Sequence, residues 1–187
     1  MYRQDLKEEY YTLKAKQDKY PARSVYKLQQ IDEKFNLFRK NDKILDLGCA
    51  PGSWLLYASN KGKVLGIDIQ DINIPLPKNA TFLKQDVNTF QTKDKFNVIL
   101  SDMAPNTSGD HSVDVERSIE LCETALAIAK TNLNKGGNFV CKIFEGEGIQ
   151  EFFKKVEQSF GFVKRYKPSA SRSESREIFI IGKNFNG

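Results

Sequence analysis

Short apolar runs alternate with segments of helical periodicity along most of this 187-residue chain, and this alternation limits the fold most strongly. Helical patterns are predicted from Pro21, where Val25, Leu28, Ile31 and Phe35 follow at helical spacing, and at 54–60, 113–133 and 149–160. The apolar runs lie at 43–47, 63–69, 81–83, 96–100, 138–144, 162–166 and 178–181. Alternation of this kind predicts βαβ units. We therefore expect an α/β, Rossmann-like fold with a mostly parallel seven-stranded sheet and helices on both faces.

The C-terminal end of the pattern predicts a departure from the parallel arrangement. The last two apolar runs are separated only by the polar segment KPSASRSESRE, which is too short for a helical crossover. We therefore expect an antiparallel C-terminal hairpin. A chain of this length, 40% hydrophobic, can build one core. We expect a single domain over 21–187, preceded by a basic N-terminal arm over 1–20.

Composition limits the classes of partner and compartment. The chain carries 29 Lys and Arg against 24 acids, for a net charge of +5, which suits nucleic acid but is also found on ordinary solvated surfaces. The three cysteines, Cys49, Cys122 and Cys141, show no C-x-x-C pairing, so we expect no disulfide framework and no metal site. No apolar run is long enough to cross a bilayer. We expect a soluble intracellular monomer without a membrane partner, cytoplasmic or, if a presequence precedes the chain, organellar such as mitochondrial.

The segment ILDLGCAPGSW, residues 44–54, places a strand directly before a glycine-bearing turn and a helix. Gly48 and Gly52 permit unusual backbone dihedrals and close approach of a ligand, and Pro51 stiffens the bend between them. In open α/β sheets, ligands bind outside the carboxyl ends of the strands. The turn therefore predicts a site for a nucleotide-like cofactor, with an ordinary strand-to-helix loop as the alternative.

Aspartates follow or close successive apolar strands and indicate which cofactor the turn accepts. Asp46, Asp68 and Asp86 are expected at one edge of the sheet, and Asp68 lies 22 positions after Asp46, close to the offset of a ribose-binding acid. The G-x-G-x-x-G fingerprint of a dinucleotide site is absent, and acids would repel a phosphate. S-adenosylmethionine fits instead, with Asp86 at the adenine amino group and Val87 at the purine plane. The alternative is that these aspartates only cap helices or solvate loops.

Lysines and acids near the same edge indicate the chemistry. Lys142 interrupts the apolar strand NFVCKIF, a costly position unless it reaches a cleft, and Asp102 opens the loop SDMAPNTSG. A lysine can act as general base for methyl transfer to a ribose hydroxyl if burial and a second cation, such as Lys27, depress its pKa. Asp102 and Glu177 can orient the amines, although a close carboxylate opposes that depression. His111, the single histidine, is expected to be solvated in a polar loop.

Several blocks occur together in order, and they carry a family resemblance over about 20–182. The matching blocks are ARSVYKL, ILDLGCAPGSW, GIDI, QDV, SDMAPNTSG, GGNFVCKIFEGEG and KPSASRSESREIFI. With these blocks the chain resembles the FtsJ-like ribosomal RNA 2′-O-ribose methyltransferases, also known as the RrmJ type. The resemblance implies a Rossmann-like class I fold and an enzyme that depends on S-adenosylmethionine.

The resemblance also implies roles for individual residues. The family's catalytic set carries over onto Lys27, Asp102, Lys142 and Glu177, with Lys142 as the proton acceptor. The residues expected around the cofactor are Asp46, Gly48, Ala50, Pro51, Gly52, Trp54, Asp68, Ile69, Asp86, Val87 and Asp102. The chain departs from the family at Ser53, where a glycine is common, and in the proline-bearing segment between Asp68 and Thr81.

The family also implies the partner, ribosomal RNA or the large ribosomal subunit. Related enzymes with the same catalytic set act on transfer RNA or messenger RNA caps, and SDMAPN favours the ribosomal branch. Cations that could form a basic rim for RNA are Arg23, Lys27, Lys164, Arg165, Lys167, Arg172 and Arg176, with Tyr26 available for base stacking. Two further alternatives are a ribosome-assembly factor that binds RNA and methylates secondarily, and a dehydrogenase.

Overall fold

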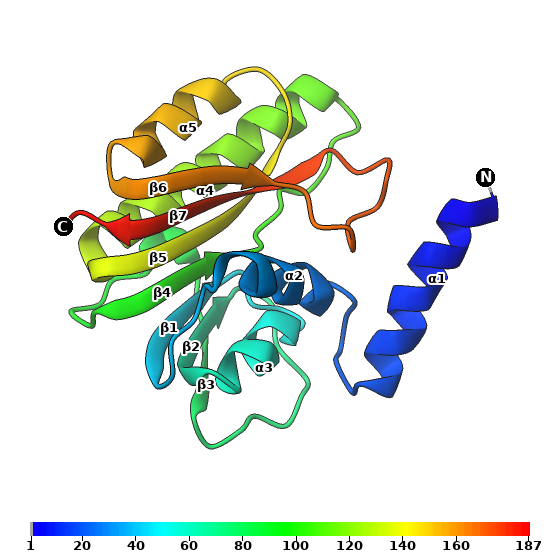
Figure 1. The fold of residues 1–187 in the computed structure, drawn as a ribbon, viewed down its shortest axis with the longest axis horizontal. Coiled ribbons are helices and arrows are strands. Elements are labelled where there is room, and N and C mark those ends of the chain that lie inside the picture. The colour runs from blue at the N-terminus through cyan, green and yellow to red at the C-terminus, as the bar shows by residue number, and fades with distance from the viewer. Residues whose placement is uncertain (1) are drawn as a thin grey trace.

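The computed structural model describes residues 2–187, with side chains from residue 8 onward. Its centre is a seven-stranded sheet with the order β3-β2-β1-β4-β5-β7-β6 (Figure 1). The strands are β1 Asp42–Leu47, β2 Gly62–Asp68, β3 Ala80–Lys84, β4 Phe96–Ser101, β5 Leu133–Phe144, β6 Phe160–Tyr166 and β7 Glu177–Phe185. Each predicted apolar run therefore forms a strand, and the predicted α/β class with a seven-stranded sheet is confirmed.

Strand directions follow the prediction for the C-terminal end. Strands β3, β2, β1, β4 and β5 pair in parallel, whereas β7 pairs antiparallel with both β5 and β6. Because β7 lies between β5 and β6, the antiparallel hairpin is confirmed and its return strand is inserted into the sheet. The register places Lys142 opposite Phe179 and Phe144 opposite Glu177.

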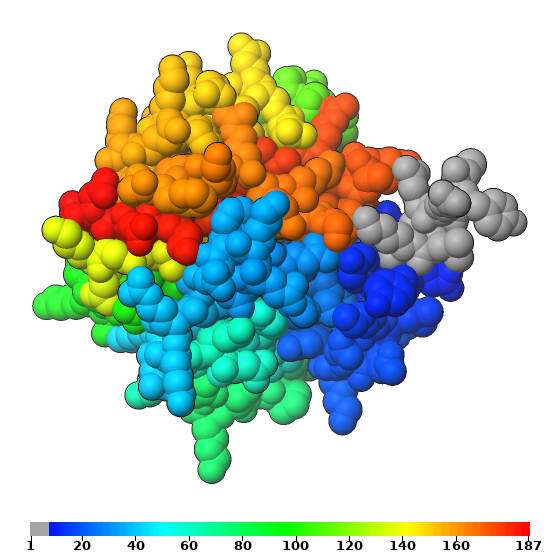
Figure 2. All heavy atoms as spheres, viewed as in Figure 1, coloured from blue at the N-terminus to red at the C-terminus, as the bar shows by residue number. Residues whose placement is uncertain are grey.

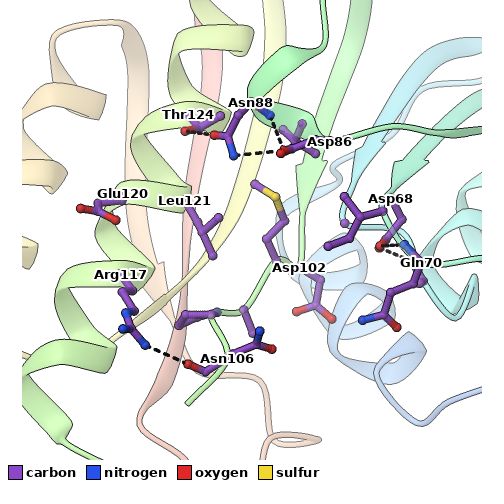
Figure 3. Close-up of a pocket in the computed structure, with 17 residues that line it drawn as sticks. Asp68, Gln70, Asp86, Asn88, Asp102, Asn106, Arg117, Glu120, Leu121 and Thr124 are labelled. Carbon is purple, nitrogen blue, oxygen red and sulfur yellow. Dashed lines mark hydrogen bonds between the residues drawn. The ribbon is translucent and has the colours of Figure 1, made fainter. Parts of the chain in front are cut away.

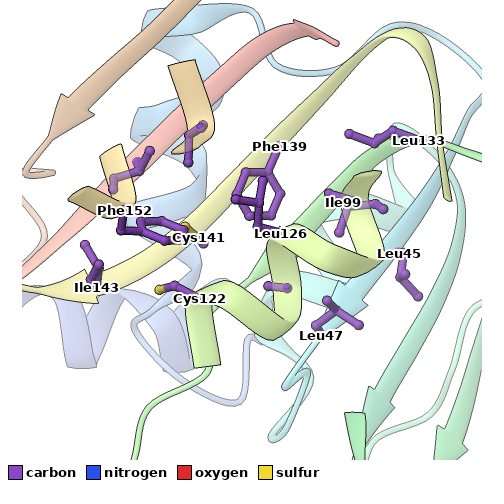
Figure 4. Close-up of a cluster of buried hydrophobic side chains, with 14 of the residues drawn as sticks. Leu45, Leu47, Ile99, Cys122, Leu126, Leu133, Phe139, Cys141, Ile143 and Phe152 are labelled. Atoms are coloured by element: carbon purple, nitrogen blue, oxygen red, sulfur yellow. The ribbon is translucent and has the colours of Figure 1, made fainter. Parts of the chain in front are cut away.

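Helices cover both faces of the sheet, as predicted (Figure 1). The helices on the sheet are α2 Val25–Phe35, α3 Ser53–Ser59, α4 His111–Asn132 and α5 Ile149–Glu157, and a short 3-10 turn lies at Val87–Thr89, whereas α1 Tyr2–Gln17 lies away from the sheet. Successive residues of a strand point to opposite faces, so each strand feeds two cores. Leu47, Ile99 and Phe139 pack beneath α4 and α5 (Figure 4), whereas Ile44 and Val98 pack beneath α2 and α3.

The boundary between α4 and β5 differs from the predicted one. The sequence predicts a helix over 113–133 and a strand over 138–144, with Lys135-Gly136-Gly137 between them, but the helix ends at Asn132 and the strand begins at once with Leu133. Leu133 pairs with Phe96, and the register shifts before the next paired residues. The glycines therefore lie inside an irregular strand, with Gly136 at φ 77°. His111 is exposed, as predicted, but it starts α4 and does not lie in a loop.

The predicted N-terminal arm contains α1, which packs on the body of the protein beside α2 (Figure 2). Ala15 is buried, and the rings of Tyr11 and Tyr26 lie 5.3 Å apart. The Tyr26 hydroxyl donates to Asp18 at 2.8 Å, and only 3% of Tyr26 is exposed. The prediction that Tyr26 is available for stacking on a base is therefore wrong, because α1 covers it.

Candidate functional site

A cavity of about 640 Å³ opens where the parallel strands end (Figure 3). Its walls come from the segments that follow β1, β2, β3 and β4, and from one face of α4. The lining residues are Gly48, Ala50, Asp68, Ile69, Gln70, Asp86, Val87, Asn88, Asp102, Met103, Ala104, Pro105, Asn106, Arg117, Glu120, Leu121 and Thr124. The structure therefore brings together seven of the residues predicted to surround the cofactor: Gly48, Ala50, Asp68, Ile69, Asp86, Val87 and Asp102.

The turn between β1 and α3 requires glycine at two positions. Gly48 has φ 73° and Gly52 has φ 106°, values that side chains rarely allow. A Cβ at Gly48 would lie 2.4 Å from the Met103 Cγ, and one at Gly52 would lie 2.3 Å from the Ile74 Cδ1. Both glycines are thus needed for the path of the backbone and for its close packing against neighbouring loops.

Two of the cavity aspartates are held by local hydrogen bonds. The Asp68 carboxylate accepts from the backbone N–H groups of Ala50 and Gln70, both at 2.8 Å. The Asp86 Oδ1 accepts from the backbone N–H of Asn88 at 2.9 Å and caps the short 3-10 turn. The capping role that competed with a ligand role is therefore present in Asp86. This capping hydrogen bond fixes the orientation of the Asp86 carboxylate at the cavity.

Asp46 lies deeper than the other carboxylates and does not line the cavity. It is fully buried within β1, and neither of its carboxylate oxygens has a hydrogen-bond partner. Burial, together with the negative charges of Asp102 and Asp68, raises the pKa of the Asp46 carboxyl well above its usual range. Three carboxyl groups therefore lie close enough together to repel one another, and a cation in the cavity would relieve that repulsion.

The residues around the cavity fit S-adenosylmethionine. Its sulfonium and ammonium groups are positive, and Asp68, Asp86 and Asp102 present carboxylates to the cavity (Figure 3). Apolar lining from Val87 and Ile69 suits a purine ring. A pyrophosphate would instead meet these carboxylates, so a dinucleotide fits the same walls poorly.

The four residues of the predicted catalytic set form two ion pairs at the edge of this cavity. The Lys142 Nζ lies 3.1 Å from the Asp102 Oδ1 and also donates to the Asp102 backbone carbonyl at 2.6 Å. The Lys27 Nζ pairs with the Glu177 Oε1. All four side chains are largely buried, with 10–16% of each exposed. The two ion pairs, built from α2, the loop after β4, β5 and β7, lie close together, since the charge of Lys142 also acts on Glu177.

The charge state of Glu177 is set by these neighbours. Burial alone raises the pKa of the Glu177 carboxyl, but the attraction and hydrogen bond of Lys27, the nearby Ser171 side chain and the charge of Lys142 outweigh it. The net effect holds the pKa below its usual value. Glu177 thus interacts with both lysines and links the two ion pairs.

Comparisons with known proteins bear on this arrangement. Residues 20–185 match the model of the FtsJ-like methyltransferase family. A protein named ribosomal RNA large subunit methyltransferase E from Lawsonia intracellularis is 48% identical to this chain, over 95% of the chain and 94% of that protein. The protein of the same name from Nitratidesulfovibrio vulgaris is 46% identical, over 96% and 94% respectively.

The chain is an FtsJ-like methyltransferase.

The fold of this FtsJ-like methyltransferase is also seen in solved structures. A crystal structure from Plasmodium falciparum, described as a ribosomal RNA methyltransferase, has a TM-score of 0.80 and 29% identity, and it covers 90% of this chain and 100% of that chain. A second structure, from Clostridium thermocellum, has a TM-score of 0.58 at 22% identity and supports the fold alone.

Four predicted cofactor residues of this FtsJ-like methyltransferase lie outside the cavity lining. Asp46 lies in β1, Pro51 and Gly52 belong to the glycine turn, and Trp54 follows the turn in α3; their cofactor role stays a prediction. Trp54 is 2% exposed, and its Nε1 donates to the backbone carbonyl of Ser24 at 2.9 Å. Its indole therefore packs in the core.

Sequence reasoning missed one wall of the cavity. Arg117, Glu120, Leu121 and Thr124 all project from α4. Their spacing of three, one and three residues places them on one face of a helix. That spacing was available in the sequence, but a mostly polar helical face also describes ordinary solvated surface, so the pattern did not single it out.

Several cations of the predicted basic rim make contacts with other residues of the protein. Arg23 and Arg172 both pair with Glu8 of α1, at 3.4 Å and 2.9 Å. Arg165 lies over the Phe153 ring at 4.6 Å, and the Lys167 Nζ donates to the Ser175 carbonyl at 2.6 Å.

Within residues 2–187, no helix is both long and apolar enough to cross a membrane.

Proposed function

We propose that this chain transfers the methyl group of S-adenosylmethionine to a ribose 2′-hydroxyl of large-subunit ribosomal RNA. One observation carries the proposal most strongly: Asp102 lines the cavity and also pairs with Lys142 at 3.1 Å. This carboxylate therefore joins the place where the methyl donor fits to the residue proposed as proton acceptor. The names of the relatives from Lawsonia and Nitratidesulfovibrio support ribosomal RNA as the substrate.

The proposed chemistry assigns a role to each residue. When bound, S-adenosylmethionine supplies a methyl group activated by the adjacent sulfonium. The ribose hydroxyl would give its proton to an unprotonated Lys142 Nζ while its oxygen takes the methyl group, so that the donor would leave as a thioether. Asp102 then stabilises the ammonium of Lys142. Lys27, which pairs with Glu177, is proposed to donate a hydrogen bond to the attacking ribose oxygen.

The remaining parts of the proposal concern organisation and setting. We propose residues 21–187 as the methyltransferase domain and residues 1–20 as an arm that adds α1 to its surface. We also propose that the chain acts as a monomer inside the cell, in whichever compartment holds its ribosomes, cytoplasmic or organellar. The cations that remain exposed around the site, including Lys164 and Arg176, suit contact with phosphates.

The substrate is tested by label transfer. The protein is incubated with S-adenosylmethionine labelled in the methyl group and, separately, with undermethylated large ribosomal subunits, naked ribosomal RNA, transfer RNA and capped messenger RNA. We expect label in large-subunit RNA at a linkage that resists alkali, as a 2′-O-methyl group does. Label found only in transfer RNA or caps would contradict the proposed substrate.

The catalytic set is tested at Lys142. We expect Lys142→Ala to reduce the transfer rate about 10²–10⁴-fold, the usual loss for a general base. Lys142→Arg is the matched variant, because a guanidinium keeps the positive charge beside Asp102 yet cannot accept a proton. We expect both variants to be equally slow and to bind S-adenosylmethionine normally in calorimetry. A Lys142→Arg enzyme with near-normal turnover would exclude Lys142 as the proton acceptor.

A further inference from the structure

Helix α2 carries Lys27. The segment that leads into this helix is hydrogen-bonded to Ser53 and Trp54, the two residues that follow the glycine turn. We propose that Ser53 and Trp54 are positioning residues that fix the Lys27 helix against the methyl-donor turn and so align Lys27 with Glu177. This inference rests on the roles proposed above for Lys27 and Glu177. It assigns a function to the last two residues of the ILDLGCAPGSW segment, whose side chains point away from the cavity.

Ser53 makes a two-point contact with the segment before α2. Its Oγ accepts from the Ala22 N–H at 2.8 Å and donates to the Ala22 carbonyl at 3.0 Å. Ser53 is 1% exposed, so both bonds are shielded from competing water. One hydroxyl therefore satisfies both backbone polar groups of a residue five positions before Lys27.

Trp54 extends the same attachment to the strand that carries Glu177. Its Nε1 donates to the Ser24 carbonyl at 2.9 Å, and its ring lies 5.7 Å from that of Phe179. Phe179 lies opposite Lys142 in the sheet and two residues after Glu177. A single buried indole thus contacts both the start of α2 and the region of β7 next to the catalytic set.

The contact of Ser53 is a feature of this chain and not a general requirement of the turn. The resembled family commonly has glycine at this position, and glycine has no hydroxyl to bond to Ala22. A second attachment of α2 exists elsewhere: the Gln30 Oε1 accepts from the Ala170 N–H at 3.0 Å. Loss of the Ser53 contact is therefore expected to misalign Lys27 and not to release the helix.

The test compares Ser53→Ala with Ser59→Ala in the full chain. Ser59 is a matched control, since it is also a buried serine of α3, but its hydroxyl donates at 2.7 Å to Leu56 within the same helix. We expect kcat on RNA to fall on the order of tenfold in Ser53→Ala, because small misplacements of reacting groups are costly. Ser59→Ala should keep kcat, and both should bind S-adenosylmethionine within about twofold of the wild type.

The pH dependence of the Tm separates a displaced Lys27 from a general loss of stability. Burial raises the pKa of Glu177, but Lys27 from α2 and Lys142 from β5 outweigh it, so a displaced Lys27 lets that pKa rise. We expect the fall in Tm on acidification to begin at higher pH in Ser53→Ala than in the wild type, and at the wild-type pH in Ser59→Ala. Trp54→Phe, which keeps a ring but removes the N–H, should repeat the fall in kcat.

Lys27→Ala serves as the reference. Full activity in Lys27→Ala would contradict the proposed catalytic set itself. Slow transfer in Lys27→Ala, with wild-type kcat in both Ser53→Ala and Trp54→Phe, would overturn only the positioning role. Weakened binding of S-adenosylmethionine at unchanged kcat would also overturn it, because Ser53 would then act on the donor.

Discussion

Asp46 is an unusual titratable residue, since neither oxygen of its buried carboxyl group has a hydrogen-bond partner. Burial, with the charges of Asp102 and Asp68 added to it, raises the pKa of that carboxyl. The folded state therefore holds the Asp46 proton more tightly than the unfolded chain does. By linkage, the contribution of Asp46 to stability is greatest below the ordinary value of 3.8 and is lost as pH rises through the folded-state pKa.

Replacing Asp46 by asparagine removes this ionisation while keeping the shape of the side chain. We expect Asp46→Asn to raise the Tm of the ligand-free protein at pH 8, where a gain of about 1 kcal/mol corresponds to roughly 2–4 °C for a chain of this size. The advantage should shrink as pH falls toward 4. Calorimetric scans of both proteins across this range measure the difference. A wild type more stable than the variant at pH 8 would contradict the raised pKa.

The pKa of Glu177 is lowered, in contrast to that of Asp46. The Lys27 pair and the other neighbours hold its pKa below 4.5 despite burial, so the carboxylate stabilises the folded state above that value. This contribution is lost as pH falls through the folded-state pKa. We expect Glu177→Gln to lower the Tm at pH 7 and to approach the wild type near pH 3. A deficit that does not change with pH would indicate lost packing instead of a lost ion pair.

Strand β5 continues past the end of β4, and beyond that point side chains of α4 form hydrogen bonds with the β5 backbone. Strand β4 ends at Ser101, which lies opposite Cys141. Beyond that point, the Cys122 thiol donates to the Lys142 carbonyl at 2.8 Å, and the Phe144 N–H donates to the Ser118 Oγ at 3.2 Å. These two side chains of one α4 face satisfy the backbone of the segment that carries Lys142.

The hydrogen bond from Cys122 predicts how much different substitutions at this position lower the free energy of unfolding. Cys122→Ala leaves the Lys142 carbonyl without this donor in a buried setting, for which we expect a loss of about 1–3 kcal/mol in the free energy of unfolding. Cys122→Ser keeps a donor at the same place, so it should lose less. Urea unfolding of the two variants measures both values. Equal losses would show that the size of the sulfur, and not the hydrogen bond, determines stability here.

The strands were predictable because their apolar runs are short and bounded by polar segments. The point at which β5 begins was not, because Leu133 continues the apolar spacing of α4 and only its pairing with Phe96 makes it part of a strand. The ion pairs of Lys142 and Lys27 were predictable in outline, since each charge interrupts or borders an apolar element. The α4 wall of the cavity was not, because its polar face has the composition of solvated surface.

Over the molecule as a whole, α1 is the part that sequence patterns describe least. Seven of its 16 residues are charged. Its packing depends on a few side chains such as Tyr11 and Ala15, which reach α2 and the loop before β7. Glu8 joins these two regions by pairing with Arg23 and Arg172. Such contacts lie far apart in sequence, so no local periodicity indicates them.

Ligand binding gives a measurement on the whole molecule that tests the proposed donor. A ligand that binds only the folded state at one hundred times its Kd adds about 2.7 kcal/mol of stability. For S-adenosylhomocysteine, which keeps the adenosine and amino-acid parts of the donor, this predicts a Tm rise of roughly 5–10 °C. NAD at the same concentration should give no rise, because its phosphates would meet the carboxylates at the cavity. Asp68→Ala should reduce the rise, since Asp68 is fixed in the cavity wall by Ala50 and Gln70. A larger rise with NAD than with S-adenosylhomocysteine would favour the dehydrogenase alternative and contradict the proposed methyl donor.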